Sequence, residues 1–162
     1  MQRFLMMATA VCFCAATATA QTKGSGSAQC AKPDPQHAIP VGDRPDHALV
    51  VQQFKCEWTK PMELGADKSK DGVSTATEEV SGDTSKGRGF HIATMESGDK
   101  AFFWYQGTGK SKDGVPLQAK GSWGLNGGSG KLKGIKGKGT YTCTASGDGL
   151  SCDVEGEYQL PK

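Results

Sequence analysis

The chain has 162 residues and a formal net charge of +2 at pH 7, from 19 Lys and Arg against 17 Asp and Glu. This length is enough for one domain with a buried core, and the near balance of charge argues against a nucleic-acid partner. The 23 glycines disfavour long helices and suit tight turns and curved strands, so an all-β domain is expected.

Residues 1–20 have the features of a cleaved signal peptide. A positively charged start precedes an uncharged apolar run, and Ala18-Thr19-Ala20 forms a small-x-small cleavage site before Gln21. The apolar run is short for a membrane span, and a polar segment follows it. The protein is therefore expected to be periplasmic or secreted after cleavage behind Ala20, with no stable membrane insertion.

Residues 21–47 are predicted to be a flexible, proline-rich N-terminal segment ahead of a β-barrel domain that spans residues 48–162. The first part, Gln21 to Ser27, is rich in Gly and Ser, and four of the seven prolines fall between Cys30 and Pro45. Proline has no amide donor and is excluded from helix interiors and central strands. This segment is therefore expected to form an extended wrap around the domain.

Seven strands are expected after residue 47, joined mostly by short loops. In the first strand, one face carries the core residues Ala48, Val50, Gln52, Phe54, Cys56 and Trp58. The next strands are predicted at residues 73–82, 89–96, 101–108 and 115–125, and a closing hairpin supplies two more. An eighth strand is expected if the N-terminal wrap or Lys131–Ile135 contributes one.

This order of elements is typical of an antiparallel meander. Closing the meander into a barrel would remove its exposed edge strands, so a single barrel of seven to eight strands is the predicted fold. A β-sandwich of two sheets is the alternative.

The register of the closing hairpin can be deduced from its residues. With Ser146-Gly147-Asp148-Gly149 as the loop, Cys143 faces Cys152, Tyr141 faces Val154 and Lys138 faces Glu157. A slip of one residue would destroy all of these matches at once. Directly opposed cysteines lie within disulfide reach, so a Cys143–Cys152 bond is predicted.

Four cysteines remain after signal cleavage, and an even number in an exported chain suggests two disulfides. The Cys30–Cys56 bond follows by elimination once Cys143 and Cys152 are paired. A four-thiolate zinc site is not expected, because no C-x-x-C spacing is present. No metal and no cofactor are predicted.

The stretch from Gly127 to Gly137, GGSGKLKGIKG, resembles a motif of the allene oxide cyclase and dirigent barrels, a calycin-like superfamily. These proteins carry a similar Gly-Gly-small-Gly-basic-apolar-x-Gly turn before a late strand. The longer run from Ser81 to Tyr158 is similar to a group of small exported bacterial proteins of unknown function. Allene oxide cyclases isomerise a lipid epoxide inside the barrel, and dirigent proteins guide radical coupling. No catalytic motif of either family matches this chain residue by residue, so the resemblance implies a fold and no active site.

The leading functional hypothesis is a binding module for a small apolar ligand inside the barrel or at its mouth. The reason is an aromatic content that exceeds what the filling of a small barrel needs. The predicted ligand-lining residues are Trp58, Phe102, Trp104, Trp123, Tyr141 and Tyr158.

A cofactor-free isomerase or cyclase is the alternative. It would use an inward carboxylate such as Glu79 or Glu96 as its acid or base. Glu78 and Glu79 are adjacent, so strand alternation turns one of them inward, and Glu96 shares its parity with Phe90 and Ile92. His91 has the opposite parity to Phe90 and Ile92, so it is expected to face solvent.

A third hypothesis is an envelope protein that contacts an anionic partner through a lysine-rich surface. The basic stripe of the late strands consists of Lys131, Lys133, Lys136 and Lys138. A surface metal site at His37 and His47 is a weaker reading, because these ligands lie on a flexible segment without fixed spacing. The sequence does not set the oligomeric state.

Overall fold

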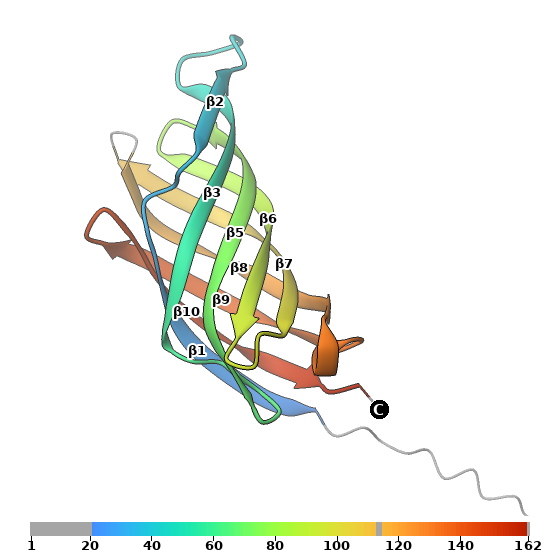
Figure 1. The fold of residues 1–162 in the computed structure, drawn as a ribbon. Helices are drawn as coiled ribbons and strands as arrows, with labels where there is room; N and C mark the ends of the chain where they lie inside the picture. Colours follow the sequence, from blue (N-terminus) through green and yellow to red (C-terminus); the bar gives the residue numbers. More distant parts are fainter. Residues whose placement is uncertain (1–20, 113–114, 162) are drawn as a thin grey trace, which may run out of the picture.

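The protein is an antiparallel β-barrel. The computed structural model describes residues 21–112 and 115–161, so the predicted signal peptide lies outside the described residues. Eight strands close into the barrel, with the order β1-β3-β5-β6-β7-β8-β9-β10 and β1 again beside β10 (Figure 1). The barrel strands are β1 (Thr22–Cys30), β3 (His47–Lys60), β5 (Asp67–Ser81), β6 (Thr84–Met95), β7 (Lys100–Lys112), β8 (Val115–Gly128), β9 (Lys136–Ser146) and β10 (Gly149–Gln159).

Two further strands and one short helical turn complete the described residues: β2 (Gln36–Pro40), β4 (Glu63–Leu64) and the 3-10 turn η1 (Gly130–Leu132). In this part of the chain, no helix has the length and apolarity needed to cross a membrane. The prediction of a meander barrel with up to eight strands is confirmed, and the β-sandwich alternative is excluded.

The closing hairpin has the predicted register. Cys143 is paired with Cys152, Tyr141 with Val154 and Lys138 with Glu157, and the Lys138 Nζ lies 3.5 Å from the Glu157 carboxylate. Both predicted disulfides, Cys143–Cys152 and Cys30–Cys56, are present.

The prediction of a flexible segment at residues 21–47 is wrong for its first third, which forms β1. This strand pairs with β10 along its whole length, from Thr22 opposite Tyr158 to Cys30 opposite Leu150. Its Gly- and Ser-rich composition has a packing reason. A Cβ placed on Gly26 would lie 2.6 Å from the Trp58 ring, so the missing side chain makes room for an aromatic ring of β3.

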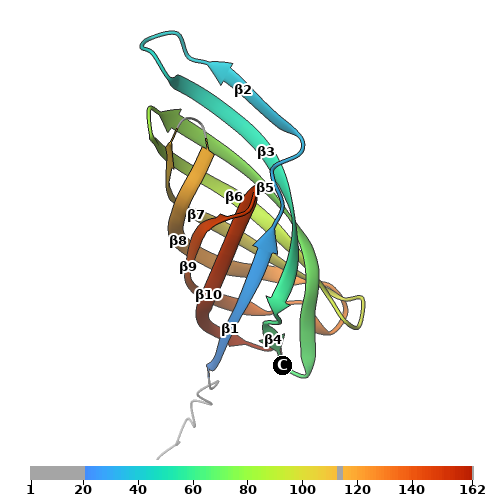
Figure 2. The same ribbon diagram turned by 90° about the vertical axis from the view of Figure 1, so that its left-hand side faces the viewer.

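The barrel has a seam between β1 and β3. Only Ser27 to Cys30 pair with β3, and a register shift interrupts even this short ladder. Farther along the same edge of β3, β2 pairs with residues 48–52. The β2–β3 hairpin therefore extends beyond the barrel wall at one end, as Figure 2 shows. The proline-rich part of the predicted wrap is thus an ordered edge of the sheet.

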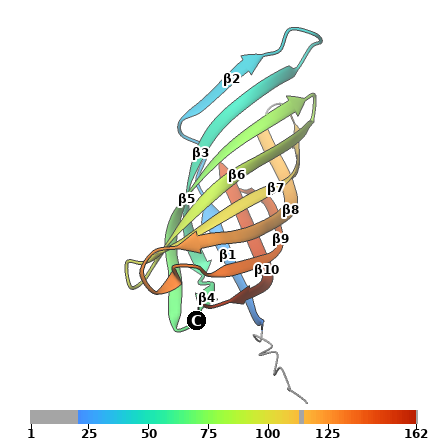
Figure 3. The same ribbon diagram turned by 90° about the vertical axis from the view of Figure 1, so that its right-hand side faces the viewer.

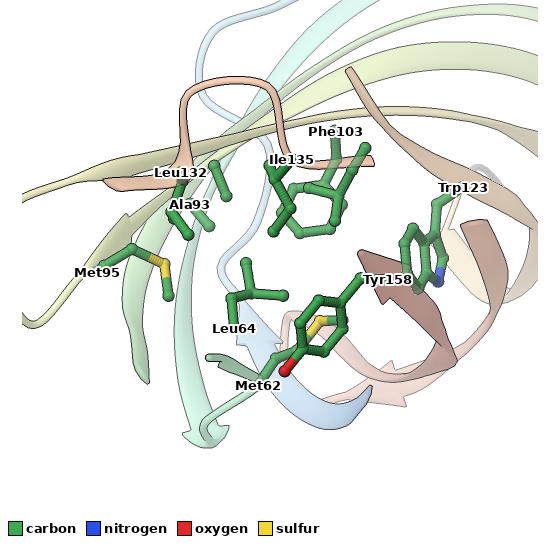
Figure 4. Packing of buried hydrophobic residues seen from close by; sticks show 11 residues of the cluster. Met62, Leu64, Ala93, Met95, Phe103, Trp123, Leu132, Ile135 and Tyr158 are labelled. Atoms are coloured by element: carbon green, nitrogen blue, oxygen red, sulfur yellow. The ribbon is translucent and has the colours of Figure 1, made fainter. Parts of the chain in front are cut away.

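The opposite end of the barrel is filled with side chains. Four of these side chains come from the β3–β4 connection, from β4, from η1 and from the segment just after η1, and each is at most 2% exposed: Met62, Leu64, Leu132 and Ile135. They pack with Met95 and Tyr158 inside the barrel (Figure 4). The Gly127–Gly137 motif thus supplies part of a hydrophobic plug, which stabilises this end and leaves the other end open.

Candidate functional site

A cavity of about 160 Å³ lies inside the barrel, between the plug and the open end. Its wall is mostly apolar and includes both disulfides. One disulfide joins β1 to β3, and the other joins β9 to β10, the strand that pairs with β1 on its other side. An apolar cavity of roughly 150 Å³ is large enough to bind benzene or xenon. The chamber therefore has room for one aromatic ring or a short aliphatic group.

Four rings form a continuous line along the cavity wall. Trp58 and His91 have centroids 6.2 Å apart, His91 and Phe103 are 6.1 Å apart, and Phe103 and Trp123 are 5.5 Å apart. Edge-to-face and tilted geometries at these distances are the preferred arrangements of aromatic pairs. The line connects β3, β6, β7 and β8, so it fixes the shape of the chamber from several strands.

His91 faces the cavity, and the prediction that it faces solvent is wrong. On β6 the apolar Phe90 and Ile92 point outward, while three residues of the inward row around His91 are small: Gly87, Gly89 and Ala93. The small inward residues accommodate large rings from other strands. A Cβ on Gly89, for example, would lie 2.5 Å from the Tyr105 hydroxyl oxygen.

The His91 ring is held in its neutral form by burial. Its Nε2 is buried without a hydrogen-bond partner, and the ring edge lies against Gly72 of β5. Loss of solvation disfavours the charged imidazolium and lowers the pKa of His91 to about 4. At neutral pH the cavity wall therefore carries an uncharged imidazole.

Other polar groups in the wall are few. The Trp58 Nε1 is also buried without a partner. The Ser74 and Tyr105 hydroxyls are 2.8 Å apart and satisfy one another. Burial raises the pKa of Tyr141 to about 12, so its phenol is neutral as well. Apart from the Glu78 carboxylate where the cavity meets its mouth, the chamber thus presents neutral polar groups set among apolar ones, a composition that suits an uncharged ligand.

The carboxylate that faces the interior is Glu78, which accepts a hydrogen bond of 2.9 Å from the Gln52 side-chain amide. The expected inward orientation of Glu79 or Glu96 is wrong. Glu79 is on the outer face, where it contacts His47, and Glu96 is exposed in the β6–β7 turn. Alternation on β5 puts Glu78 inside because Ser74 and Ala76 have the same parity.

The cavity widens beyond Glu78 and Tyr141 into an open depression of about 1140 Å³. Six strands contribute one inward residue each, together with its two chain neighbours. These inward residues form one row of directly paired positions: Val50, Glu78, Gly87, Gly107, Gly121 and Tyr141. Three adjacent strands thus have glycine in this row, which leaves the mouth of the barrel wide.

Three of the six predicted ligand-lining residues, Trp58, Trp123 and Tyr141, line the cavity. Tyr158 instead belongs to the plug, where its hydroxyl accepts a hydrogen bond of 2.9 Å from the Gly65 amide.

Phe102 and Trp104 lie on the outer face of β7, so their predicted place in the cavity is wrong. Their neighbours Phe103 and Tyr105 face inward. Residues 102–105 are all aromatic, so the two faces of β7 have the same character in this stretch. The sequence could therefore not show which pair faces the interior.

His47 lies on the outside of the barrel between two carboxylates. Its Nδ1 contacts Asp43, and its Nε2 is 3.0 Å from a Glu79 oxygen. The hydrogen bond with Asp43 is the main cause that raises the pKa of His47. Across residues 21–112 and 115–161, no group of three or more His, Cys, Asp or Glu side chains has an arrangement that could hold a metal ion.

No protein-family model, no curated protein and no solved structure matches this chain.

Acidification is expected to destabilise the fold through His91. The folded pKa of about 4 lies below the ordinary value of 6.5, so the unfolded chain binds more protons between these two values. The contribution of the buried, neutral His91 to the free energy of unfolding is therefore present above pH 6.5. The free energy of unfolding should fall by roughly 2 kcal/mol by pH 5. His47 acts in the opposite direction, because its pKa is raised.

Denaturant unfolding of a His91→Leu variant between pH 7.5 and pH 5 tests this expectation. The variant should lose most of the pH dependence, whereas His37→Gln, at an exposed position on β2, should retain it. An unchanged pH dependence in His91→Leu would show that the imidazole titrates normally in the folded protein.

Proposed function

We propose that the protein is an exported binding module that takes one small, uncharged, mostly apolar ligand into its barrel. The observation that carries the proposal is the apolar chamber of about 160 Å³, open toward a wide mouth and lined by neutral rings. Small eight-stranded barrels have interiors that are either filled by side chains or large enough for one small ligand. Here side chains fill only the plugged end.

The wall chemistry narrows the ligand class. Burial keeps His91 and Tyr141 neutral, so the chamber offers no cation to neutralise an anionic ligand head, and the Glu78 carboxylate in its wall disfavours an anion further. An aromatic ring or a branched aliphatic group suits the inner chamber, and a longer or more polar part of the ligand would lie beside Glu78 in the mouth.

The expected compartment agrees with this role. Two disulfides are compatible with an oxidising environment outside the cytoplasm. The predicted signal peptide would bring the chain there. A carrier in an aqueous compartment needs an interior that shields its ligand from water, and the plugged barrel supplies one.

Titration with benzene, toluene and p-xylene tests the proposal, with tryptophan fluorescence as the readout. Trp58 and Trp123 line the cavity, so a ligand in the chamber should change their emission in a saturable way. Ala119→Phe places a ring inside the chamber and should weaken binding at least tenfold.

The matched control is Gln118→Phe, which adds the same ring at the neighbouring, exposed position of β8. It should bind as the unchanged protein does. Saturable binding that Ala119→Phe leaves unaltered would place the ligand elsewhere, and no binding of any probe would refute the ligand class.

A further inference from the structure

The charges of the barrel are unevenly distributed around its wall. Four consecutive strands, β6 to β9, contain no Asp or Glu at all. The same strands carry eight exposed cations: Lys86, Arg88, Lys100, Lys110, Lys112, Lys120, Lys136 and Lys138. We call the outer surface of these strands the cationic face. The near-zero net charge of the whole chain hides this asymmetry, because most strand carboxylates lie on β3, β5 and β10.

An exposed apolar patch lies at one border of the cationic face. Val73, Ile92 and Phe102 are directly paired across β5, β6 and β7, and Phe90 is directly paired with Trp104 in the adjacent row. Phe90 is 63% exposed, and the other four are between 37% and 43% exposed. Exposed clusters of large apolar side chains mark contact surfaces on soluble proteins.

The patch and the cations lie on the same side of the molecule. Arg88 precedes Phe90 by two residues on β6, Lys100 precedes Phe102 by two residues on β7, and all four side chains point outward. The strands β6 to β9 run side by side along one wall, which is visible in Figure 3. An apolar surface bordered by cations is therefore presented to one partner as a unit.

We propose that this face docks the protein peripherally on an anionic lipid surface. Lysine and arginine near such a surface are attracted by its negative potential, and each contributes independently of a fixed pairing geometry. Phenylalanine and tryptophan partition into the interface between lipid headgroups and acyl chains. The cationic face and its bordering patch combine these cations with these aromatic residues. The cations are spread over four strands, which suits a membrane surface, whose negative charge is spread over a plane.

The charge distribution also argues against a second copy of this chain as the partner that covers the apolar patch and the cationic face. In a symmetric dimer, the same patch would face itself, and Arg88 and Lys100 of both copies would be brought together. Such like charges disfavour association. A lipid surface of opposite charge meets no such penalty. This inference does not depend on the cavity ligand, and its test measures binding to vesicles instead of binding of a ligand in the barrel.

Co-sedimentation with vesicles tests the proposal on the folded, disulfide-bonded chain. Binding is expected with vesicles of phosphatidylcholine and phosphatidylglycerol and at least tenfold weaker binding with phosphatidylcholine alone. Raising the salt from about 0.05 M to about 0.5 M should release most of the bound protein.

Two double variants separate the contributions of charge and apolar contact. Lys86→Glu with Arg88→Glu and, separately, Phe90→Ser with Trp104→Ser should each weaken vesicle binding at least tenfold. The matched controls lie off the cationic face: Lys23→Glu on β1 and Ile39→Ser on β2, where Ile39 is 69% exposed. Both controls should bind within twofold of the unchanged protein.

Several outcomes would overturn the proposal. Equal binding to both vesicle types, or equal losses in the control variants, would remove the role of the cationic face. A salt-resistant dimer that Phe90→Ser with Trp104→Ser dissociates would assign the patch to a second copy. Binding to heparin that needs the cations but not the aromatic residues would assign the face to a soluble polyanion.

Discussion

Replacing Cys30 and Cys56 together by alanine is expected to lower the free energy of unfolding by about 3.5 kcal/mol. The bond joins residues 26 apart in the sequence, so its removal restores a large loop entropy to the unfolded chain. It also joins β1 to β3 across the seam, where backbone pairing covers only four residues of β1. Chemical denaturation, monitored by far-ultraviolet circular dichroism, measures the loss.

The second disulfide supplies the matched comparison. Cys143 and Cys152 are only 9 residues apart and lie within a hairpin that is paired along its length, so their joint replacement by alanine should cost about 2.5 kcal/mol. Both pairs face the same cavity, so the loss of buried sulfur is similar. An equal or larger loss for the hairpin bond would show that the seam does not limit the stability of the barrel.

The closing hairpin shows what the sequence alone could establish. Its register was predictable because several independent pairs, including Cys143 with Cys152 and Lys138 with Glu157, agree on one alignment. The core face of β3 was predictable for a similar reason, since the charged Lys55 and Glu57 have the opposite parity to the inward residues around them, such as Cys56. Where one strand face differs clearly from the other, alternation is sufficient.

The candidate site was harder to predict, because apolar residues occupy the outside of β6 and β7. The exposed Phe90 and Ile92 have the pattern of a core face, and the inward row beside them consists of small residues and His91. Alternation shows that two faces differ but not which one is inside. The misassigned faces of β6 and β7 also carry the apolar patch, so the error arose where an apolar row serves a contact surface instead of the core.

The first strand was missed for a related reason. In β1 the inward residues Gly24 and Gly26 are small because Met62 and Trp58 fill the space in front of them. The need for small residues came from side chains more than thirty positions away in the sequence. Local composition therefore indicated a linker where the folded chain has a barrel strand.

Replacing Trp123 by alanine is expected to lower the free energy of unfolding by about 4 kcal/mol, within the range for the truncation of a buried aromatic residue. Trp123 is 4% exposed, and its Nε1 donates a hydrogen bond of 3.0 Å to the Thr140 carbonyl. Its ring lies over two glycines, because a Cβ on Gly139 or Gly156 would come within 2.6 Å of the ring. No side chain at either glycine could close the space that the substitution opens.

Trp104→Ala is the matched control, since it removes the same side chain from the outer face of β7, where it is 37% exposed. Its cost should be smaller, about 1 to 2 kcal/mol, because solvent can enter the space that the substitution opens on the outer face and no buried cavity is left. Denaturant unfolding of both variants measures the difference. Comparable losses in the two variants would mean that Trp104 contributes to the core as much as Trp123 does, and would contradict both the assigned faces of β7 and β8 and the outer apolar patch.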